Sequence, residues 1–452
     1  MRIAAIAVVN PCTTSKEQYS FKLPSVTTTA ATGHGTTTST TTTAVSTLQL
    51  NNTTKNSDFS WTSLKYDSLS AHEYTHALKL GNKWKEYQGI NNWEGLLDPL
   101  DDNLRDEILR YGQFVEAAYR ACDFDSSSPN YGTSKFPRRS LLTRSGIGET
   151  GYRVIKSLKA SCGIQLPRWI HRAPGWIWRQ SSWIGYVAVC QDKDEIARLG
   201  RRDVVIAYRG TATRMEWIEN LRATLTPLPE DMANVGPESS STGAMVESGF
   251  LSLYTSSTAK CPSLQDMVRE AIAKVLKIYG NQPLSITVTG HSLGAALATL
   301  TAYDINSTFP NAPMVTVMSF GGPRVGNQSF RRQLERNGTR VLRIVNSDDL
   351  ITKVPGFVID NNDMVDRGTA NVVGFPSWLQ KRVEDTQWVY ADVGQELRLS
   401  SKDCPHLSKG NVATCHELST YLQLVNAYVS SKCPFRDSLK YSREKLERLV
   451  EV

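Results

Sequence analysis

One segment near residue 290 constrains the fold of this chain more than any other part. Leu284–Thr289 is a short run of apolar and β-branched residues that leads directly into Gly290-His-Ser-Leu-Gly294. Residues 293–306 follow, and they are rich in Ala and Leu. A strand, a G-x-S-x-G turn and a helix in this order predict a strained turn that lifts a serine hydroxyl above the edge of a sheet. The segment therefore indicates an α/β fold, with Ser292 as the candidate nucleophile.

Strands and helices alternate on both sides of this segment. Further strands are expected at 183–189, 204–208, 315–320 and 341–345, and further helices at 216–225 and 264–279. This alternation favours a mostly parallel central sheet flanked by helices on both faces. Upstream, an amphipathic helix packed on the core is predicted from apolar residues at helical spacing, namely Leu104, Ile108, Tyr111, Val115 and Tyr119. Residues 126–182 are expected to be irregular.

The first 70 residues differ in composition from the rest of the chain. Most positions between Thr27 and Thr43 are threonine, and Glu17 is the only acidic residue before Asp58. Such a segment buries too little apolar surface to fold, and its composition is typical of an organelle transit peptide. A secretory signal built on Ile3–Val9 and an inert disordered tail are the competing interpretations. We expect a disordered leader at 1–70, a helical extension at 71–182, a catalytic core at 183–430 and a basic tail at 431–452.

Charge and cysteine content exclude several classes of protein. The net charge is +7, from 51 Lys and Arg against 44 Asp and Glu, and no basic run with interleaved aromatic residues suggests a nucleic-acid partner. The simple interpretation of this charge is a solvated surface. The more specific interpretation is a weak attraction of the protein to anionic lipid headgroups. A membrane-spanning helix needs about 20 consecutive apolar residues, and no apolar run in this sequence approaches that length. The 8 cysteines are too sparse for a disulfide scaffold, although one bridge among Cys404, Cys415 and Cys433 stays open.

A serine hydroxyl needs a positioned base, and the chain offers few histidines for that role. Only His406 and His416 follow the serine. His291 directly precedes it inside the turn, and we expect His291 to be structural. His416 is favoured because Thr414 and Glu417 resemble a capping box that would place it in the first turn of a helix. His406 lies in a loop-like stretch and is the alternative base.

The acid and the oxyanion donors are expected beside the same edge of the sheet. Asp348 and Asp349 directly follow the strand at 341–345, and spacing alone does not choose between them. One oxyanion donor should be the backbone N–H of Leu293, directly after the nucleophile. The second is expected from Thr211, after the strand at 204–208, because Gly210 permits close approach of the backbone. This chemistry needs no metal ion or cofactor.

Several motifs in combination resemble the class 3 lipase family. They are Tyr208-Arg-Gly-Thr211, Gly290-His-Ser-Leu-Gly294, Phe320-Gly-Gly-Pro-Arg-Val-Gly-Asn327, and Val345-Asn346 with Asp349 and Val354-Pro355. More narrowly, Trp93-Glu-Gly-Leu-Leu-Asp-Pro-Leu100 and Arg110-Tyr-Gly112 resemble the plastid class I phospholipases A1 of plants. The resemblance covers roughly residues 90–430. It implies an α/β-hydrolase fold, a Ser292–Asp349–His416 triad, and Thr211 as an oxyanion residue.

The resemblance also implies a substrate and a location. It suggests a chloroplast enzyme that hydrolyses acyl esters of phospholipids or galactolipids at sn-1, releasing a fatty acid and a lysolipid. A triacylglycerol lipase or carboxylesterase is the alternative. A non-catalytic lipase-like adaptor is the alternative of another class, but such adaptors carry a long helical domain, whereas about 35 residues follow His416 here. No protein partner is indicated.

In such lipases, a lid follows the oxyanion strand. Here that place is taken by Thr213–Leu221, in which four apolar side chains recur at helical spacing: Met215, Trp217, Ile218 and Leu221. The stripe is expected either to face lipid as an interfacial lid at a membrane surface or to pack against the enzyme body.

Overall fold

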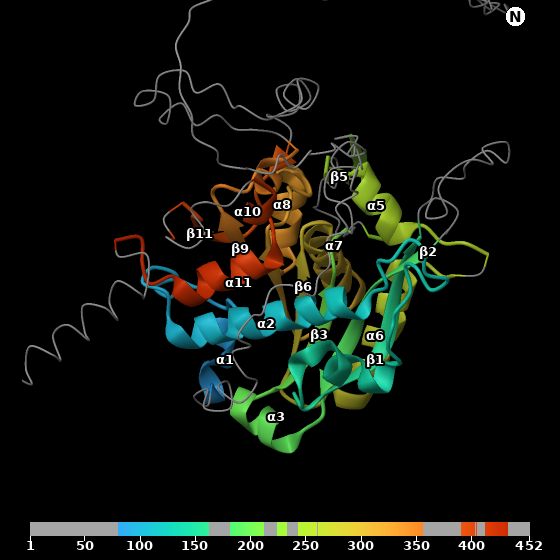
Figure 1. Ribbon diagram of the computed structural model, residues 1–452, viewed down its shortest axis with the longest axis horizontal. Helices are drawn as coiled ribbons and strands as arrows, with labels where there is room; N and C mark the ends of the chain where they lie inside the picture. The colour runs from blue at the N-terminus through green and yellow to red at the C-terminus, as the bar shows by residue number, and fades with distance from the viewer. Residues whose placement is uncertain are drawn as a thin grey trace, which may run out of the picture. The chain divides into compact units, whose positions relative to one another are not determined.

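A mostly parallel sheet forms the centre of the computed structural model (Figure 1). The structure describes residues 80–161, 181–211, 224–232, 243–259, 261–355, 390–402, 404 and 412–432, all within the compact unit Lys65–Val452. The central sheet has seven strands in the order β1-β2-β3-β6-β7-β9-β11. From β3 to β11 each neighbouring pair is parallel, whereas β1 and β2 add antiparallel strands at one edge. The predicted fold class is confirmed.

The strands of this sheet contain every strand that the sequence predicted. Their bounds are β1 Tyr152–Ser161, β2 Ser181–Cys190, β3 Arg202–Tyr208, β6 Leu284–His291, β7 Met314–Phe320, β9 Arg340–Asn346 and β11 Gln395–Leu399. A second, four-stranded sheet consists of β10 Tyr390–Ala391, β8 Gly326–Asn327, β5 Met245–Glu247 and β4 Leu225–Pro227.

Strand β1 corrects the interpretation of residues 126–182 as irregular. It pairs with β2, but its register shifts between Val154 and Lys156 and again between Leu158 and Lys159. These irregularities break the two-residue period by which a strand is identified in a sequence. The described part of the N-terminal extension therefore contributes a strand to the central sheet as well as helices.

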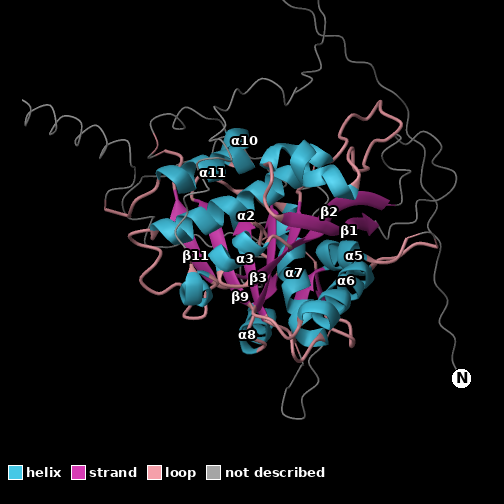
Figure 2. Ribbon diagram, turned by 90° about the horizontal axis from the view of Figure 1, so that it is seen from below, coloured by secondary structure: helices cyan, strands magenta, loops and turns pink. Residues whose placement is uncertain are grey.

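Helices cover both faces of the sheet, as Figure 2 shows. Their bounds are α1 Trp84–Tyr87, α2 Asp102–Ala121, α3 Lys193–Leu199, α5 Ser248–Thr255, α6 Leu264–Tyr279, α7 Leu293–Thr308, α8 Gln328–Arg336, α10 Val412–Cys415 and α11 Leu418–Ala427. Short helical turns lie at Gly81–Lys83, Arg138–Ser140, Thr143–Ile147 and Ile351–Lys353. The helices predicted at 264–279 and from 293 are present. Of the helix predicted at 216–225, most lies outside the described residues, and Leu225 begins β4.

Alternation along β3 explains the two layers of helices. Val204, Ile206 and Tyr208 pack into the apolar cluster formed with α5, α6, α7 and α8. Val205 and Ala207 point the other way, into the cluster formed with α1, α2 and α11. Because side chains of a strand alternate between its faces, a continuous apolar run satisfies both layers at once. None of the helices among the described residues has the length and hydropathy of a membrane span.

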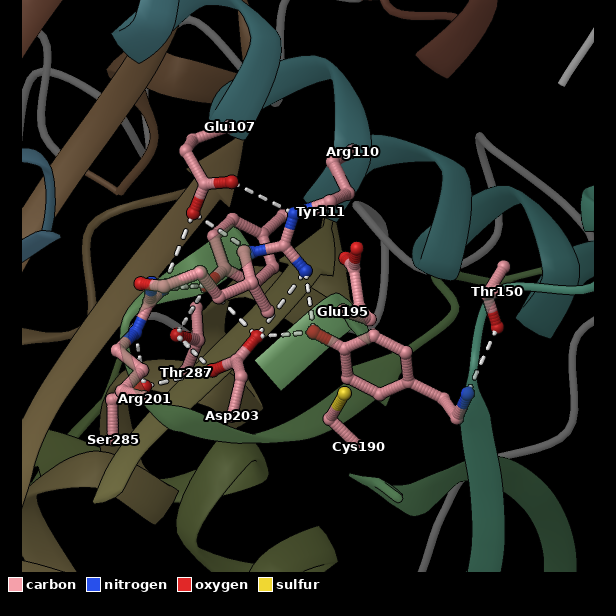
Figure 3. Close-up of polar contacts among 12 residues, drawn as sticks. Glu107, Arg110, Tyr111, Thr150, Cys190, Glu195, Arg201, Asp203, Ser285 and Thr287 are labelled. Carbon is pink, nitrogen blue, oxygen red and sulfur yellow. Dashed lines mark hydrogen bonds and ion pairs between the residues drawn. The ribbon is translucent and has the colours of Figure 1, made fainter. Parts of the chain in front are cut away.

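A buried polar cluster joins α2 to the beginnings of β3 and β6 (Figure 3). Glu107 accepts hydrogen bonds from Arg110 over 2.7 Å and from Arg201 over 3.2 Å. Asp203, at the start of β3, accepts from the hydroxyl of Tyr111 over 3.1 Å. Burial by itself would raise the pKa of Glu107, but the charges of Arg110 and Arg201 outweigh it and lower the pKa to about 2. This cluster therefore fixes α2 on the sheet by charge as well as by apolar packing.

Candidate active site

Ser292 stands in a sharp turn between the end of β6 and the start of α7. Its backbone has φ 58° and ψ −125°, a left-handed conformation that is strained for a residue with a side chain. A Cβ on Gly290 would lie 2.8 Å from the nitrogen of Ala295, and one on Gly294 would lie 2.7 Å from the carbonyl oxygen of Tyr208. Only glycine fits these two positions. The turn predicted from G-x-S-x-G is therefore present, with the serine held at the edge of the sheet.

The parallel strands end together at this edge. Residue pairing places Tyr208 of β3 beside Gly290 of β6, and His291 of β6 beside Phe320 of β7. In such sheets, the loops after the carboxyl ends of neighbouring strands converge on one place. Segments that follow β3, β6 and β9 therefore meet around Ser292.

His416 bridges the serine and an aspartate. Its Nε2 lies 2.8 Å from Oγ of Ser292, and its Nδ1 lies 2.6 Å from Oδ2 of Asp349. A carboxylate only accepts, so Nδ1 carries the proton, and in the neutral imidazole the lone pair of Nε2 faces the serine hydroxyl. Both His416 and Asp349 are buried. This arrangement has the geometry of a nucleophile, a base and an orienting acid.

The secondary structure around His416 differs from the prediction. His416 lies in the turn between α10 and α11, not in the first turn of a helix capped by Thr414. Thr414 is itself helical, and its carbonyl oxygen accepts hydrogen bonds from the backbone N–H of Glu417 over 3.1 Å and from the hydroxyl of Thr420 over 2.7 Å. The capping box was wrong because Val412–Cys415 already forms a short helix. His406 lies outside the described residues.

The two adjacent aspartates have different partners. Oδ1 of Asp349 accepts a hydrogen bond from the N–H of Ile351 over 2.9 Å, which leaves Oδ2 directed at His416. Asp348 instead accepts from the hydroxyl of Ser400 over 2.9 Å and forms an ion pair of 2.9 Å with Lys402. The structure thus places Asp349 at the histidine, while Asp348 holds the chain after β11.

The electrostatics of Asp348 agree with this anchoring position. Burial would raise the pKa of Asp348, but hydrogen bonds from Lys402 and Ser400 outweigh it and lower the pKa below its usual value. The carboxylate is therefore ionised over the physiological range, with its charge facing Lys402.

Asn346 holds the turn that carries His416, although no role was expected for its side chain. Its Nδ2 donates to the carbonyl oxygen of Cys415 over 2.9 Å, directly before His416. The same nitrogen donates to Oγ of Ser401 over 2.6 Å. Because both partners of this nitrogen lie more than 50 residues later in the chain, only the folded chain reveals these contacts. Cys404 and Cys415 are buried free thiols, and Cys433 lies outside the described residues.

The predicted oxyanion residues lie in the two segments that flank the serine. Leu293 is the first residue of α7, so its N–H has no carbonyl partner within the helix. Thr211 follows Gly210, where a Cβ would lie 3.0 Å from Cβ of Ser292. Arg209 fixes this segment by donating to the carbonyl oxygens of Trp183 over 3.0 Å and of Gly210 over 2.6 Å. The proposed lid residues Met215, Trp217, Ile218 and Leu221 lie outside the described residues.

Comparisons with known proteins agree with these motifs. Residues 205–359 match the family described as "Lipase (class 3)". The chain is 66% identical over 364 residues to the chloroplastic phospholipase A(1) DAD1 of Arabidopsis thaliana, covering 80% of each chain. It is 38% identical over 386 residues to the chloroplastic galactolipase DONGLE of the same plant, covering 83% of this chain and 76% of that relative. With this identity and coverage, the chain belongs to the class 3 lipase family, alongside plant phospholipases A1.

Proposed function

We propose that this protein is a serine acylhydrolase that acts on membrane glycerolipids as a phospholipase A1. The observation that carries the proposal is the position of His416, within 2.8 Å of the serine hydroxyl and 2.6 Å of the Asp349 carboxylate. Its relatives are named phospholipases A1 and a galactolipase, which supports a glycerolipid substrate with a phosphate or galactose headgroup.

The chemistry follows the roles that the geometry supports. Ser292 attacks the ester carbonyl while His416 accepts the hydroxyl proton, and the backbone N–H groups of Thr211 and Leu293 stabilise the oxyanion. His416 then gives that proton to the departing alkoxide of the lysolipid. Asp349 orients the imidazole and stabilises its charged form. In the second half of the reaction, water repeats the attack on the acyl-enzyme and releases the fatty acid.

A substrate panel tests this function. The purified protein is incubated with phosphatidylcholine, monogalactosyldiacylglycerol, digalactosyldiacylglycerol and triacylglycerol, each carrying a labelled sn-1 chain. We expect release of the labelled fatty acid from the polar glycerolipids, and a fall of several orders of magnitude in Ser292→Ala, on the order of 10⁶-fold as for other serine hydrolases. Turnover of triacylglycerol alone would contradict the phospholipase assignment, and turnover by Ser292→Ala would contradict the site.

We also propose that residues 1–70 direct the protein to the chloroplast, with an extension at 71–182, a catalytic core at 183–430 and a basic tail at 431–452. The threonine-rich, acid-poor composition supports a transit peptide, and several relatives are named chloroplastic. A fusion of residues 1–70 to a fluorescent protein should accumulate in plastids. Fluorescence in the secretory pathway would contradict this location.

The apolar stripe of Met215, Trp217, Ile218 and Leu221 is proposed, on its sequence pattern, to contact the membrane surface. Trp217→Ser should then lower activity on vesicles about 30-fold more than activity on a soluble short-chain ester, because one aromatic ring contributes on the order of 2 kcal/mol to partitioning. Equal losses on both substrates together with a lower melting temperature would show that Trp217 packs inside the enzyme.

A further inference from the structure

Tyr119 reaches the active site from the last turn of α2, outside the segment 205–359 that matches the family. Its hydroxyl oxygen accepts a hydrogen bond from the N–H of Gly210 over 2.9 Å. Gly210 directly precedes Thr211, so this contact fixes the backbone of the oxyanion segment. The same hydroxyl lies 2.7 Å from Nδ1 of His291.

His291 continues the connection to the base. Its Nε2 lies 2.8 Å from the backbone carbonyl oxygen of His416. A carbonyl only accepts, so Nε2 carries the proton, and in the neutral imidazole Nδ1 accepts the proton of the Tyr119 hydroxyl. The rings of His291 and His416 are 4.8 Å apart between centroids. A continuous chain of hydrogen bonds thus runs from Gly210 through Tyr119 and His291 to His416.

This chain connects two segments that must act on the same substrate atom. The oxyanion segment follows β3, whereas the histidine turn lies about 200 residues later, between α10 and α11. The N–H groups must face the oxyanion while Nε2 of His416 faces the serine hydroxyl, and errors of about 1 Å in such geometry cost about 100-fold in rate. A shared bridge through Tyr119 and His291 keeps the two segments in a fixed relation.

The N-terminal part of α2 is fixed to α11, the helix that follows His416. Arg105, Gly112 and Tyr119 are spaced by seven residues, so they share one face of α2. Arg105 donates to the carbonyl oxygen of Val425 over 2.6 Å and to that of Tyr428, at the end of α11. Gly112 leaves room for the side chain of Leu422. Figure 1 shows α2 and α11 side by side, and both helices contribute to the same apolar cluster.

We propose, on the basis of the function above, that Tyr119 is a positioning residue for catalysis, which sets the oxyanion segment and the catalytic histidine relative to each other through Gly210 and His291. It acts through Gly210 and His291 rather than on the reacting atoms. Its hydroxyl, rather than its ring, performs this role, because both hydrogen bonds involve that one oxygen.

The test compares Tyr119→Phe with Tyr186→Phe. Tyr186 is the matched control, since its buried hydroxyl also contacts α2, donating over 2.8 Å to the carbonyl oxygen of Phe114. For each variant, kcat, KM and the melting temperature are measured with a soluble short-chain ester, together with the affinity for a trifluoromethyl ketone that forms a tetrahedral adduct with serine. We expect Tyr119→Phe to lower kcat and ketone affinity by on the order of 10- to 100-fold. Its KM should stay within twofold, and Tyr186→Phe should keep kcat within twofold.

Two results would overturn the proposal. One is a kcat of Tyr119→Phe within twofold of wild type. The other is a loss of kcat that is equal in the two variants and parallels the fall in their melting temperatures. A hydroxyl that only stabilises the fold would lower kcat and the melting temperature together. Ser292→Ala, assayed in parallel, separates this failure from failure of the proposed function: turnover in Ser292→Ala refutes the function itself, whereas an inactive Ser292→Ala beside a fully active Tyr119→Phe refutes only the positioning role.

Discussion

Tyr421 donates its hydroxyl proton over 2.6 Å to Oδ2 of Asp349, the same carboxylate oxygen that faces His416. Burial and the charge of Asp349 raise the pKa of Tyr421 well above its usual value, so the phenol stays a donor at every working pH. With the N–H of Ile351 on the other oxygen, the carboxylate is held in one orientation.

Removal of this hydroxyl should weaken catalysis without abolishing it. Tyr421→Phe is expected to lower kcat about tenfold, because a hydrogen bond to a charged group contributes about 1.5–3 kcal/mol and the imidazole still holds the carboxylate. Steady-state kinetics on a soluble ester measure the effect. Tyr428→Phe, at the end of the same helix, is the control and should keep kcat within twofold; equal effects in the two variants would argue against a role at Asp349.

The adjacent aspartates should respond differently to the same substitution. Asp349→Asn should lower kcat on the order of 10⁴-fold, because an amide in that place favours the wrong tautomer of His416. Asp348→Asn should keep kcat within about threefold, since its bonds go to Ser400 and Lys402. Parallel kinetics decide the matter, and a severe loss in the Asp348 variant would move the acid to that residue.

The buried cluster at α2 should make stability depend on pH. The folded pKa of Glu107, about 2, lies below its ordinary value, so the carboxylate contributes its full stability above about pH 4.5 and loses it as the pH falls toward 2. Glu107→Gln should lower the free energy of unfolding by about 3 kcal/mol at pH 7, because the buried charge of Arg201 loses this carboxylate, and of its two ion pairs Arg110 keeps only the one with Asp203. Denaturant unfolding should also show a shallower fall between pH 5 and pH 2 in this variant; an unchanged slope would contradict the assignment.

Gly294, the last residue of the G-x-S-x-G motif, should not tolerate a side chain. In Gly294→Ala the new methyl would lie 2.6 Å from the carbonyl oxygen of Arg209 and 2.7 Å from that of Tyr208, so α7 must move away from β3. We expect a loss of about 1–3 kcal/mol in the free energy of unfolding. We also expect kcat to fall by more than this loss of stability explains, because the N–H of Leu293 moves with the helix. Thermal melts and kinetics on the purified variant measure both, and near wild-type activity would contradict this packing.

The sequence by itself determined the elements whose signals are local. The alternation of strands and helices and the G-x-S-x-G turn follow from residues within about 25 positions of one another, and the structure contains them at 284–308. The order of residues along the chain also restricted the base to His406 and His416, and the resemblance to class 3 lipases implied His416. Local signals did fail where the local pattern was broken, as in β1 with its irregular register, or ambiguous, as at Thr414.

Only the tertiary structure decided which neighbouring polar groups meet. Asp348 and Asp349 are equivalent in spacing, and the resemblance to class 3 lipases pointed to Asp349 without a physical reason. The folded chain supplies the reason, because Ser400 and Lys402 hold Asp348 while His416 and Tyr421 hold Asp349. Tyr119 and Tyr421 have the helical spacing of ordinary core residues, so no pattern marks their hydroxyls. A hydrogen bond depends on the distance and direction between two atoms. For partners separated by 172 residues, as Tyr119 and His291 are, both are set only when the sheet and its two layers of helices have packed.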